Sequence, residues 1–224
     1  MRFRLARQED WGQISSISSR AGYDDYINQV GPAYLQVGRI YVAEEERIMG
    51  FVKVEDLPDG STWASGMRVA PEFRRLGVAS SLMEHAISSE AARSDEMRLI
   101  VEDSNTPSLN LVSKLGFRKV SGFEFHRGNP LLGETEDVEI ERGSFLNIGW
   151  RFARAHHASF HPRALMSGGI TVYRASETAY HVLRPTPRVE ILPSEGYTAV
   201  EVGSGIEVAG STDRSVFFLF SRKI

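Results

Sequence analysis

The sequence predicts a mixed α/β (α+β) fold for residues 1–125, followed by a smaller β-rich domain over residues 138–224. In the first part, segments whose apolar residues alternate, as in half-buried strands, are interleaved with segments whose apolar residues recur at helical spacing. In the second part, short β-type runs are separated by glycine and proline. The turn-rich residues 126–137 lie between the two parts and are predicted to be a linker.

The composition is that of a globular protein. Hydrophobic residues make up 42% and charged residues 25%, which excludes disordered and fibrous chains. The formal net charge is -3, without the basic excess of a nucleic-acid-binding module, so no nucleic-acid partner is expected. The absence of cysteine excludes disulfides and thiolate sites. Because no apolar stretch is long enough for a membrane helix or signal peptide, we expect a cytoplasmic protein with no membrane partner.

The elements of the first part follow from the spacing of apolar residues. A strand at residues 3–5 precedes two helical stretches, at about 9–17 and 24–37. After three strands, the apolar residues return to one helical face, which predicts a helix from about Arg74 to Ala92. A strand, a short helix closed by Gly116 and a last strand complete this part. The remaining predicted strands cover residues 39–43, 48–54, 62–69, 97–101 and 117–125, and the short helix covers residues 105–115.

The second part is predicted to be β-rich, with one helix around residues 150–157. Its run Val216–Phe220 indicates a buried strand, or an exposed strand that pairs with another protomer in a homodimer. His156, His157 and His161 lie close together, but no nearby carboxylate or cysteine completes a metal site, so no metal is expected. The β-type runs are residues 170–174, 188–192, 198–202, 206–208 and 216–220.

The segment from residue 67 to residue 82 has the pattern of an anion site. It reads as a strand, a turn through Pro71 and the start of an amphipathic helix. The first backbone N–H groups of such a helix have no intrahelical partner, and the helix dipole adds positive potential there. Gly77 allows close approach of a bulky anion, and Arg74 and Arg75 add positive charge. The segment therefore predicts a phosphate-binding helix terminus.

Two runs resemble the signatures of the GNAT superfamily of N-acetyltransferases. Its pyrophosphate-binding motif is matched by Val69-Ala70-Pro71 and Arg74-Arg75-Leu76-Gly77-Val78-Ala79. Its second signature is matched by a strand ending at Val101, then Asn105, a short helix and Lys114-Leu115-Gly116-Phe117. The resemblance covers about residues 1–125. It implies a GNAT-type mixed, mostly antiparallel sheet flanked by helices, and an N-acyltransferase that uses acetyl-CoA (coenzyme A) as co-substrate.

The resemblance also implies roles for individual residues. Backbone groups of Met67 and Val69 would bind the pantetheine arm as an added strand does. Backbone N–H groups of residues 75–80 would hold the pyrophosphate. For Ser108 and Asn110, a plain helix-surface position is the equal alternative. The predicted cofactor-binding residues are Met67, Arg68, Val69, Arg74, Arg75, Leu76, Gly77, Val78, Ala79, Ser80, Asn105, Ser108 and Asn110.

The sequence departs from the family pattern at Val112, where many members carry a tyrosine that protonates the leaving thiolate. Valine cannot donate a proton, and the next residue, Ser113, is turned by about 100° around the helix. No general base stands out either, so no catalytic residue is predicted. The candidate carboxylates, each more simply a solvated strand-end residue, are Glu55, Asp56, Glu102 and Asp103.

Two functions remain open from the sequence. The first is transfer of an acetyl or other short acyl group from acyl-CoA to a primary amine, of a small molecule, peptide or protein, by direct attack in a ternary complex. The alternative is a catalytically weak acyl-CoA-binding sensor or interaction protein. The residues Tyr23-Asp24-Asp25-Tyr26 fall where GNAT proteins build the substrate wall, although a helix-start turn is the simpler interpretation. Residues 138–224 are interpreted as a substrate-covering or dimerising module, or as a degenerate GNAT-like lobe.

Overall fold

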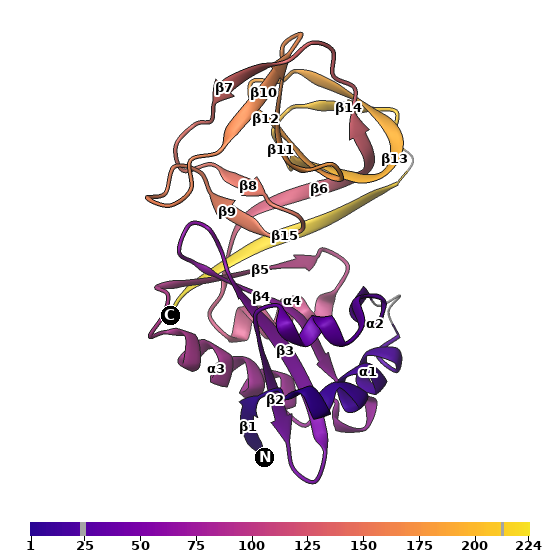
Figure 1. Ribbon diagram of the computed structural model, residues 1–224, viewed down its shortest axis with the longest axis vertical. Helices are drawn as coiled ribbons and strands as arrows, with labels where there is room; N and C mark the ends of the chain where they lie inside the picture. Colours follow the sequence, from indigo (N-terminus) through magenta and orange to yellow (C-terminus); the bar gives the residue numbers. More distant parts are fainter. Residues whose placement is uncertain (23–25, 212) are drawn as a thin grey trace.

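The structure is a computed structural model that describes residues 1–22, 26–211 and 213–224. Two lobes lie one above the other (Figure 1). We call residues 1–130 together with 214–224 the N-terminal lobe, and residues 131–213 the C-terminal lobe. Within the described part of the chain, no helix has the length and apolarity needed to cross a membrane.

The helices and strands follow one another as a mixed first part and a β-only second part. In chain order the elements of the N-terminal lobe are β1 (Arg2–Leu5), η1 (Gln8–Asp10), α1 (Trp11–Ser19), α2 (Tyr26–Val30), η2 (Gly31–Gln36), β2 (Arg39–Glu44), β3 (Ile48–Asp56), β4 (Thr62–Val69), η3 (Pro71–Phe73), α3 (Val78–Glu90), β5 (Glu96–Glu102), α4 (Thr106–Lys114), β6 (Arg118–Pro130) and β15 (Arg214–Lys223). The elements of the C-terminal lobe are β7 (Glu136–Glu139), β8 (Phe145–Asn147), β9 (Phe152–Arg154), β10 (Arg163–Ser167), β11 (Ile170–Ser176), β12 (Ala179–Leu183), β13 (Arg188–Glu201) and β14 (Glu207–Ala209).

The strand β15 returns from the C-terminal lobe and lies between β5 and β6, antiparallel to both. Phe217 of β15 stands opposite Glu102 of β5 and Phe123 of β6. The main sheet has the order β1-β2-β3-β4-β5-β15-β6-β13-β12-β11-β10-β7, and β14 pairs with β13. Its neighbours are antiparallel, apart from the parallel pairs β4/β5, β12/β13 and β13/β14. The predicted mixed, mostly antiparallel sheet flanked by helices is confirmed.

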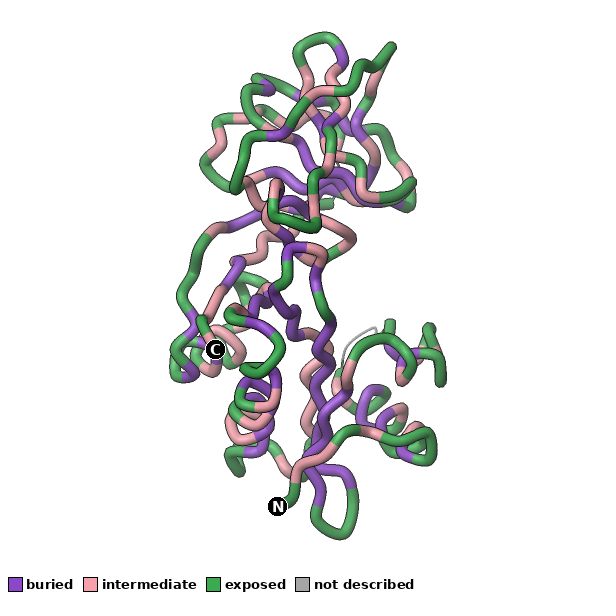
Figure 2. The backbone as a smooth tube through the Cα atoms, turned by 60° about the vertical axis from the view of Figure 1, so that its left-hand side comes forward, coloured by how far each residue is buried: buried purple, intermediate pink, exposed green. Residues whose placement is uncertain are grey.

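Helices cover both faces of the N-terminal sheet. On one face, α3 and α4 pack against the strands through a core that includes Leu82 and Val112. On the other face, α1 and η2 cover β2 and β3 through residues that include Ile14 and Tyr34. Figure 2 accordingly shows buried residues running along the strands between these layers. The central strands are thus fixed from both sides, which makes them a rigid support for a site.

The hairpin β8–β9 of the C-terminal lobe packs on the N-terminal lobe around a buried arginine. Arg98 of β5 is 2% exposed, and it forms ion pairs with Asp59 and Glu96, each at 2.6 Å. Its guanidinium also donates to the carbonyl of Phe152 at 3.2 Å, and the Arg154 backbone N–H donates to Asp59 at 2.6 Å. Because a buried charge is costly without partners, this network strongly favours the observed docking of the hairpin.

Three element predictions are corrected. Residues 126–130, predicted as part of a linker, continue β6, and residues 136–137 already belong to β7. The predicted runs 188–192 and 198–202 are one long strand, β13, with an irregular register between Leu192 and Tyr197. The helix predicted around residues 150–157 is instead β9 with flanking turns, because its aromatic residues alternate across the hairpin. The division into domains at 1–125 and 138–224 stays a prediction.

Candidate functional site

The parallel strands β4 and β5 diverge after a short contact. They pair at Thr62 opposite Met97 and at Trp63 opposite Arg98. Beyond these pairs the described residues form no ladder between the two strands, so the backbone edge of β4 that faces β5 is open. The predicted residues Met67, Arg68 and Val69 lie on this open stretch. A strand-like ligand could therefore add to β4 there.

A bulge in β4 marks the start of the open stretch. Gly66 and Met67 stand opposite the single residue Val52 of β3. Gly66 has a φ of +62°, and a Cβ at this position would lie 2.3 Å from the Tyr34 hydroxyl oxygen. Glycine suits this position for two reasons. The backbone is left-handed, and the Tyr34 side chain fills the space that a Cβ would occupy.

The open edge of β4 leads into the start of α3. Arg75 and Gly77 both have left-handed backbone, with φ of 63° and 80°. The backbone N–H groups of residues 75–80 donate to no described residue. Such unpaired donors, at the positive end of a helix and in a turn with left-handed residues, form an anion-binding concavity. Of the other predicted residues, Leu76 belongs to this turn, and Val78, Ala79 and Ser80 are the first three residues of α3.

The charges around the α3 terminus favour an anion. Arg75 is exposed and forms no ion pair within the described residues. Arg74 donates to the carbonyls of Ala21 and Val69, at 3.2 and 3.4 Å, so that it is partly fixed by the backbone. The nearby carboxylate of Glu72 is compensated by Arg20 at 3.0 Å and by a second arginine. Diphosphate groups fit this surface.

The second group of predicted residues lies at the same end of the sheet. Because β4 and β5 run parallel, the helices that follow them begin side by side in the fold. Asn105 is the N-cap of α4, and its side-chain oxygen accepts the Ser108 N–H at 3.2 Å. Ser108 is half-buried and Asn110 is exposed. The sequence predicted Asn105 as a cofactor residue, and its capping role is a further finding.

No proton donor stands at position 112. The Val112 side chain is 4% exposed and belongs to the core between α4 and the sheet. The neighbouring Ser113 is exposed on the outer side of α4. At positions 112 and 113, helix α4 therefore contributes to packing and does not direct a proton donor toward the sheet.

Two of the candidate carboxylates, on β3, are already engaged. Glu55 is 8% exposed, and its two oxygens contact Lys53 at 2.9 Å and Arg151 of the C-terminal lobe at 3.0 Å. Asp56 points to the other face of the sheet and pairs with Arg39. Hydrogen bonds from Arg39 hold the pKa of Asp56 below its ordinary value. Both carboxylates are fixed in ion pairs with neighbouring cations.

Of the other two candidates, Glu102 is the last residue of β5 and Asp103 follows it. Glu102 is four residues beyond Arg98, at the same end of the sheet as the bulged residues Gly66 and Met67 of β4. Glu102 is exposed and forms no ion pair within the described residues. By strand alternation it shares a face with Ile100, away from α3 and α4. Asp103 is exposed next to it. Glu102 is therefore the free carboxylate beside the open edge of β4.

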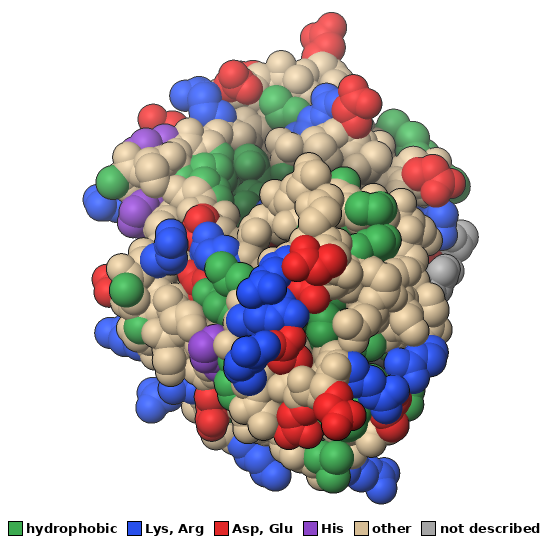
Figure 3. All heavy atoms as spheres, turned by 60° about the horizontal axis from the view of Figure 1, so that its bottom comes forward, with side chains coloured by type: hydrophobic (Ala, Val, Ile, Leu, Met, Phe, Trp, Pro, Cys, Tyr) green, Lys and Arg blue, Asp and Glu red, His purple; other side chains and the backbone are tan. Residues whose placement is uncertain are grey.

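The face of the sheet opposite α3 and α4 is the open side of this site. Ser65 of β4 lies there, opposite Lys53, and its hydroxyl is buried with no hydrogen-bond partner among the described residues. Of the predicted wall Tyr23-Asp24-Asp25-Tyr26, the first three residues lie outside the described residues. Tyr26 is 42% exposed and its ring meets that of Tyr34 edge-on at 6.1 Å. Seen partly from below, the molecule has a hollow lined by hydrophobic side chains (Figure 3).

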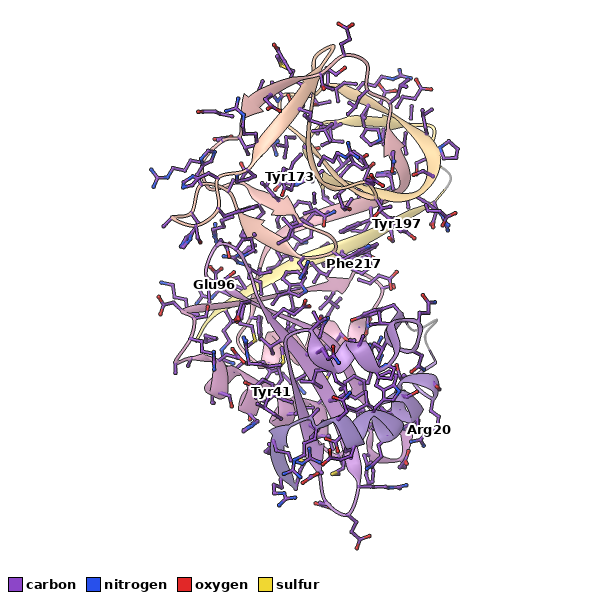
Figure 4. The ribbon with its side chains drawn as sticks, in the orientation of Figure 1. Arg20, Tyr41, Glu96, Tyr173, Tyr197 and Phe217 are labelled. Atoms are coloured by element: carbon purple, nitrogen blue, oxygen red, sulfur yellow. The ribbon has the colours of Figure 1, made fainter. Side chains whose placement is uncertain are left out.

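Sequence reasoning missed the residues that the C-terminal lobe and the returning strand β15 bring to this face. Trp150 and Arg151 come from the turn between β8 and β9, and Phe217 comes from β15. Figure 4 shows Phe217 and Tyr197 near the junction of the lobes. Along the chain, these residues are far from the anion-binding segment, residues 67–82. The hydrophobic run 216–220 was the one signal that could have indicated a return to the first lobe.

The histidines of the C-terminal lobe do not form a metal cluster. The rings of His156 and His161 are 5.7 Å apart, and the Nε2 atom of His156 contacts the Ile140 carbonyl at 2.5 Å. Over the described ranges, no group of three or more His, Cys, Asp or Glu side chains could hold a metal ion.

Comparisons with known proteins agree with this geometry. The sequence profile of the acetyltransferase (GNAT) family matches residues 5–117. An N-alpha-acetyltransferase of Sulfurisphaera tokodaii is 30% identical over 140 residues, which cover 53% of this chain and 81% of that protein. The catalytic subunit of the N-terminal acetyltransferase B complex of Arabidopsis thaliana is 32% identical over 76 residues, 32% of this chain and 44% of that protein. The crystal structure of a proposed acetyltransferase from Thermoplasma acidophilum has the same fold over 100% of both chains, with a TM-score of 0.65 and 19% identity.

Proposed function

The chain belongs to the acetyltransferase (GNAT) family, and we propose from this premise that it transfers an acetyl group from acetyl-CoA to a primary amine. The observation that carries the proposal is the open edge of β4 leading directly into the unpaired N–H groups of residues 75–80. An extended arm with a diphosphate at one end, which is the shape of CoA, fits this path.

The chemistry requires an amine, a thioester and two proton transfers. The acceptor loses a proton from its ammonium group, the free nitrogen attacks the thioester carbonyl, and the C–S bond breaks. As the amide forms, the attacking nitrogen loses its second proton, and the thiolate takes up one proton. A site that holds amine and carbonyl together removes a large part of the barrier. Since α3 and α4 cover one face of the sheet, the acceptor approaches from the opposite face.

We propose Glu102 as the group that receives the ammonium proton. It is the exposed, unpaired carboxylate on the acceptor face, at the same end of the sheet as the open edge of β4. Glu55 already neutralises two cations, so it serves better as a fixed charge than as a base. The proton donor for the thiolate is left open, because Val112 is part of the core and the Ser65 hydroxyl is enclosed, with no hydrogen-bond partner among the described residues.

Calorimetry with acetyl-CoA tests the binding step. The unchanged chain should bind acetyl-CoA, and Arg75→Ala should weaken binding by about tenfold, because one charge-assisted contact is worth about 1.5 kcal/mol or more. Arg142→Ala, an exposed arginine of the C-terminal lobe, is the matched control and should bind as the unchanged chain does. Absence of acetyl-CoA binding in the unchanged chain would overturn the proposed function.

Steady-state release of CoA with amine acceptors tests the role of Glu102. Glu102→Gln should lower kcat by about 10²–10⁴-fold with unchanged acetyl-CoA affinity, and raising the pH should restore part of the rate as the acceptor deprotonates in solution. Asp103→Asn, next to it on the exposed loop, is the control. Equal rates for the two variants would remove Glu102 from the mechanism. Acetyl-CoA binding without turnover over a broad amine panel would favour the sensor function.

A further inference from the structure

We propose that the C-terminal lobe builds one wall of the acceptor site, and that the acceptor is a primary amine joined by a short chain to an aromatic group. The inference rests on the proposed acetyltransferase function and concerns the same site. It starts from an aromatic cluster, formed by Phe125, Trp150, Tyr197 and Phe217, that begins beside the free carboxylate of Glu102.

Glu102 and Phe217 are neighbours on the acceptor face. They are register partners in the antiparallel pair β5/β15, so their Cα atoms are about 5 Å apart and their side chains point to the same side. An ammonium group at Glu102 would therefore also lie close to an aromatic ring, which attracts cations. The carboxylate end of the cluster thus suits the reacting amine.

Trp150 extends this surface away from the carboxylate. Its ring meets the Phe217 ring at 5.4 Å and the Tyr197 ring at 5.1 Å, both steeply inclined. It stacks on the buried Phe125 ring at 4.1 Å with an angle of 3°. Trp150 is nevertheless 38% exposed. One face of the indole is packed, and the exposure leaves room for a further ring against the other.

The backbone of Trp150 is held in a costly conformation. Its φ of 62° is left-handed, which bulky residues rarely adopt. The Asn147 side chain fixes it by accepting the Trp150 N–H at 2.8 Å. Such strained conformations persist where the surroundings enforce them, and they concentrate at ligand sites. Glycine would fit this turn without strain, so the presence of tryptophan indicates that its side chain is needed.

Arg151 ties this turn to the acceptor face of the N-terminal lobe. Its guanidinium contacts Glu55 of β3 at 3.0 Å, across the junction of the lobes. Glu55 is in turn held by Lys53, whose ammonium lies 4.9 Å above the Tyr34 ring. The turn is thus positioned relative to the same strand pair that borders the open edge of β4. Carboxylate, aromatic surface and open edge together select an aromatic primary amine.

The test compares 2-phenylethylamine with n-butylamine as acceptors of the full chain. The KM for 2-phenylethylamine should be at least tenfold lower. Trp150→Gly should raise this KM to that of n-butylamine and leave the KM values for n-butylamine and acetyl-CoA unchanged. Glycine relieves the left-handed backbone but removes the packing of the indole, so circular dichroism and acetyl-CoA calorimetry check that the variant is folded. Trp150→Phe should keep most of the preference.

The outcomes separate the two proposals. Turnover of both amines with equal KM, or an unchanged preference in Trp150→Gly, would overturn the inference and leave the acetyltransferase intact. Failure to bind acetyl-CoA would overturn both. The dipeptide amides Phe-Ala and Ala-Ala, added to the same assay, distinguish the source of the aromatic amine. A lower KM for Phe-Ala than for 2-phenylethylamine would assign it to a peptide N-terminus, and the reverse to a free small molecule.

Discussion

His181 is a neutral base sealed inside the C-terminal lobe. Its side chain is packed against the rings of Phe123 and Phe152, and its Nδ1 atom accepts the Asn147 N–H at 3.3 Å. Burial lowers the pKa of His181 from its ordinary 6.5 to about 3. The unfolded chain therefore binds a proton below pH 6.5 that the folded chain does not bind, and acid favours unfolding.

We predict that His181→Asn flattens the acid dependence of stability. Asn can still accept the Asn147 N–H but does not titrate. In the unchanged chain the free energy of unfolding should fall by about 1.4 kcal/mol per pH unit below pH 6.5 from this group alone. Urea unfolding at pH 7 and pH 5 measures the difference. The control His157→Asn, at an exposed position, should keep the full slope, and equal slopes in both variants would contradict the prediction.

Some residues of the candidate site could be predicted from the sequence and others could not. The strand–turn–helix order of the anion motif could be predicted, because helix starts and glycine have fixed local chemistry. The helix start could not: the helix predicted from about Arg74 begins at Val78, and Arg75 and Gly77 lie in a left-handed turn before it. The sequence did not predict the Ser65 hydroxyl that lacks a partner among the described residues, or the left-handed backbone of Trp150. Their significance depends on neighbours from distant parts of the chain, and no local pattern encodes those neighbours.

At the scale of elements, β5 carries the contact that holds the lobes together. Arg98 is buried between the acidic side chains of Asp59 and Glu96, under the ring of Phe145. Without this arginine, the buried Asp59 would lose its ion pair, whereas the partly exposed Glu96 would keep Arg154 at 3.6 Å. The strand therefore serves both the open edge beside β4 and the docking of the β8–β9 hairpin.

We predict that Arg98→Met destabilises the fold by about 3–5 kcal/mol, because it removes the ion-pair partner of the buried Asp59. Arg154→Met is the matched control, since Arg154 stacks on the same Phe145 ring, but its side chain is 43% exposed. Arg154→Met should lower the free energy of unfolding by at most about 1 kcal/mol. Urea denaturation curves give both values. A similar loss in the two variants would show that the ring contact, not the buried ion pairs, dominates.

Most elements of the N-terminal lobe were predictable, because their apolar periodicity is regular and their turns contain glycine or proline. The C-terminal lobe was less so. Strands as short as β8 and β9 carry few residues and no clear period, and β13 was split into two runs by its own irregular segment. A second GNAT-like lobe would need helices, whereas the described residues between 131 and 213 form strands.

At the scale of the whole molecule, β15 makes the N-terminal lobe dependent on the far end of the chain. Its side chains fill both faces of the sheet, with Phe220 in the core under α3 and Leu219 in the core under the β8–β9 hairpin. Without β15, the edges of β5 and β6 would be unpaired. The two parts of the chain that the sequence separates at residue 126 therefore share one sheet, because β15 lies between β5 and β6.

We predict that a fragment of residues 1–130 does not fold, whereas a chain that joins residue 126 to residue 214 by Asn-Gly does. Arg214 stands directly opposite His126, so a two-residue hairpin turn can close this pair of strands. Near-ultraviolet circular dichroism and acetyl-CoA calorimetry report folding and binding. If the 1–130 fragment folds and binds as the joined chain does, β15 is dispensable. The joined chain should also lack the preference for aromatic amines.

The position of β15 has a consequence for biosynthesis. The middle of the N-terminal sheet stays open on the ribosome after β5 has emerged, until residue 223 is made. At 5–20 residues per second this delay is roughly 6 to 24 s. During that time the edges of β5 and β6 that β15 will cover are unpaired, which favours strand exchange between nascent chains. Slow translation of residues 131–213 should therefore increase the requirement for chaperones.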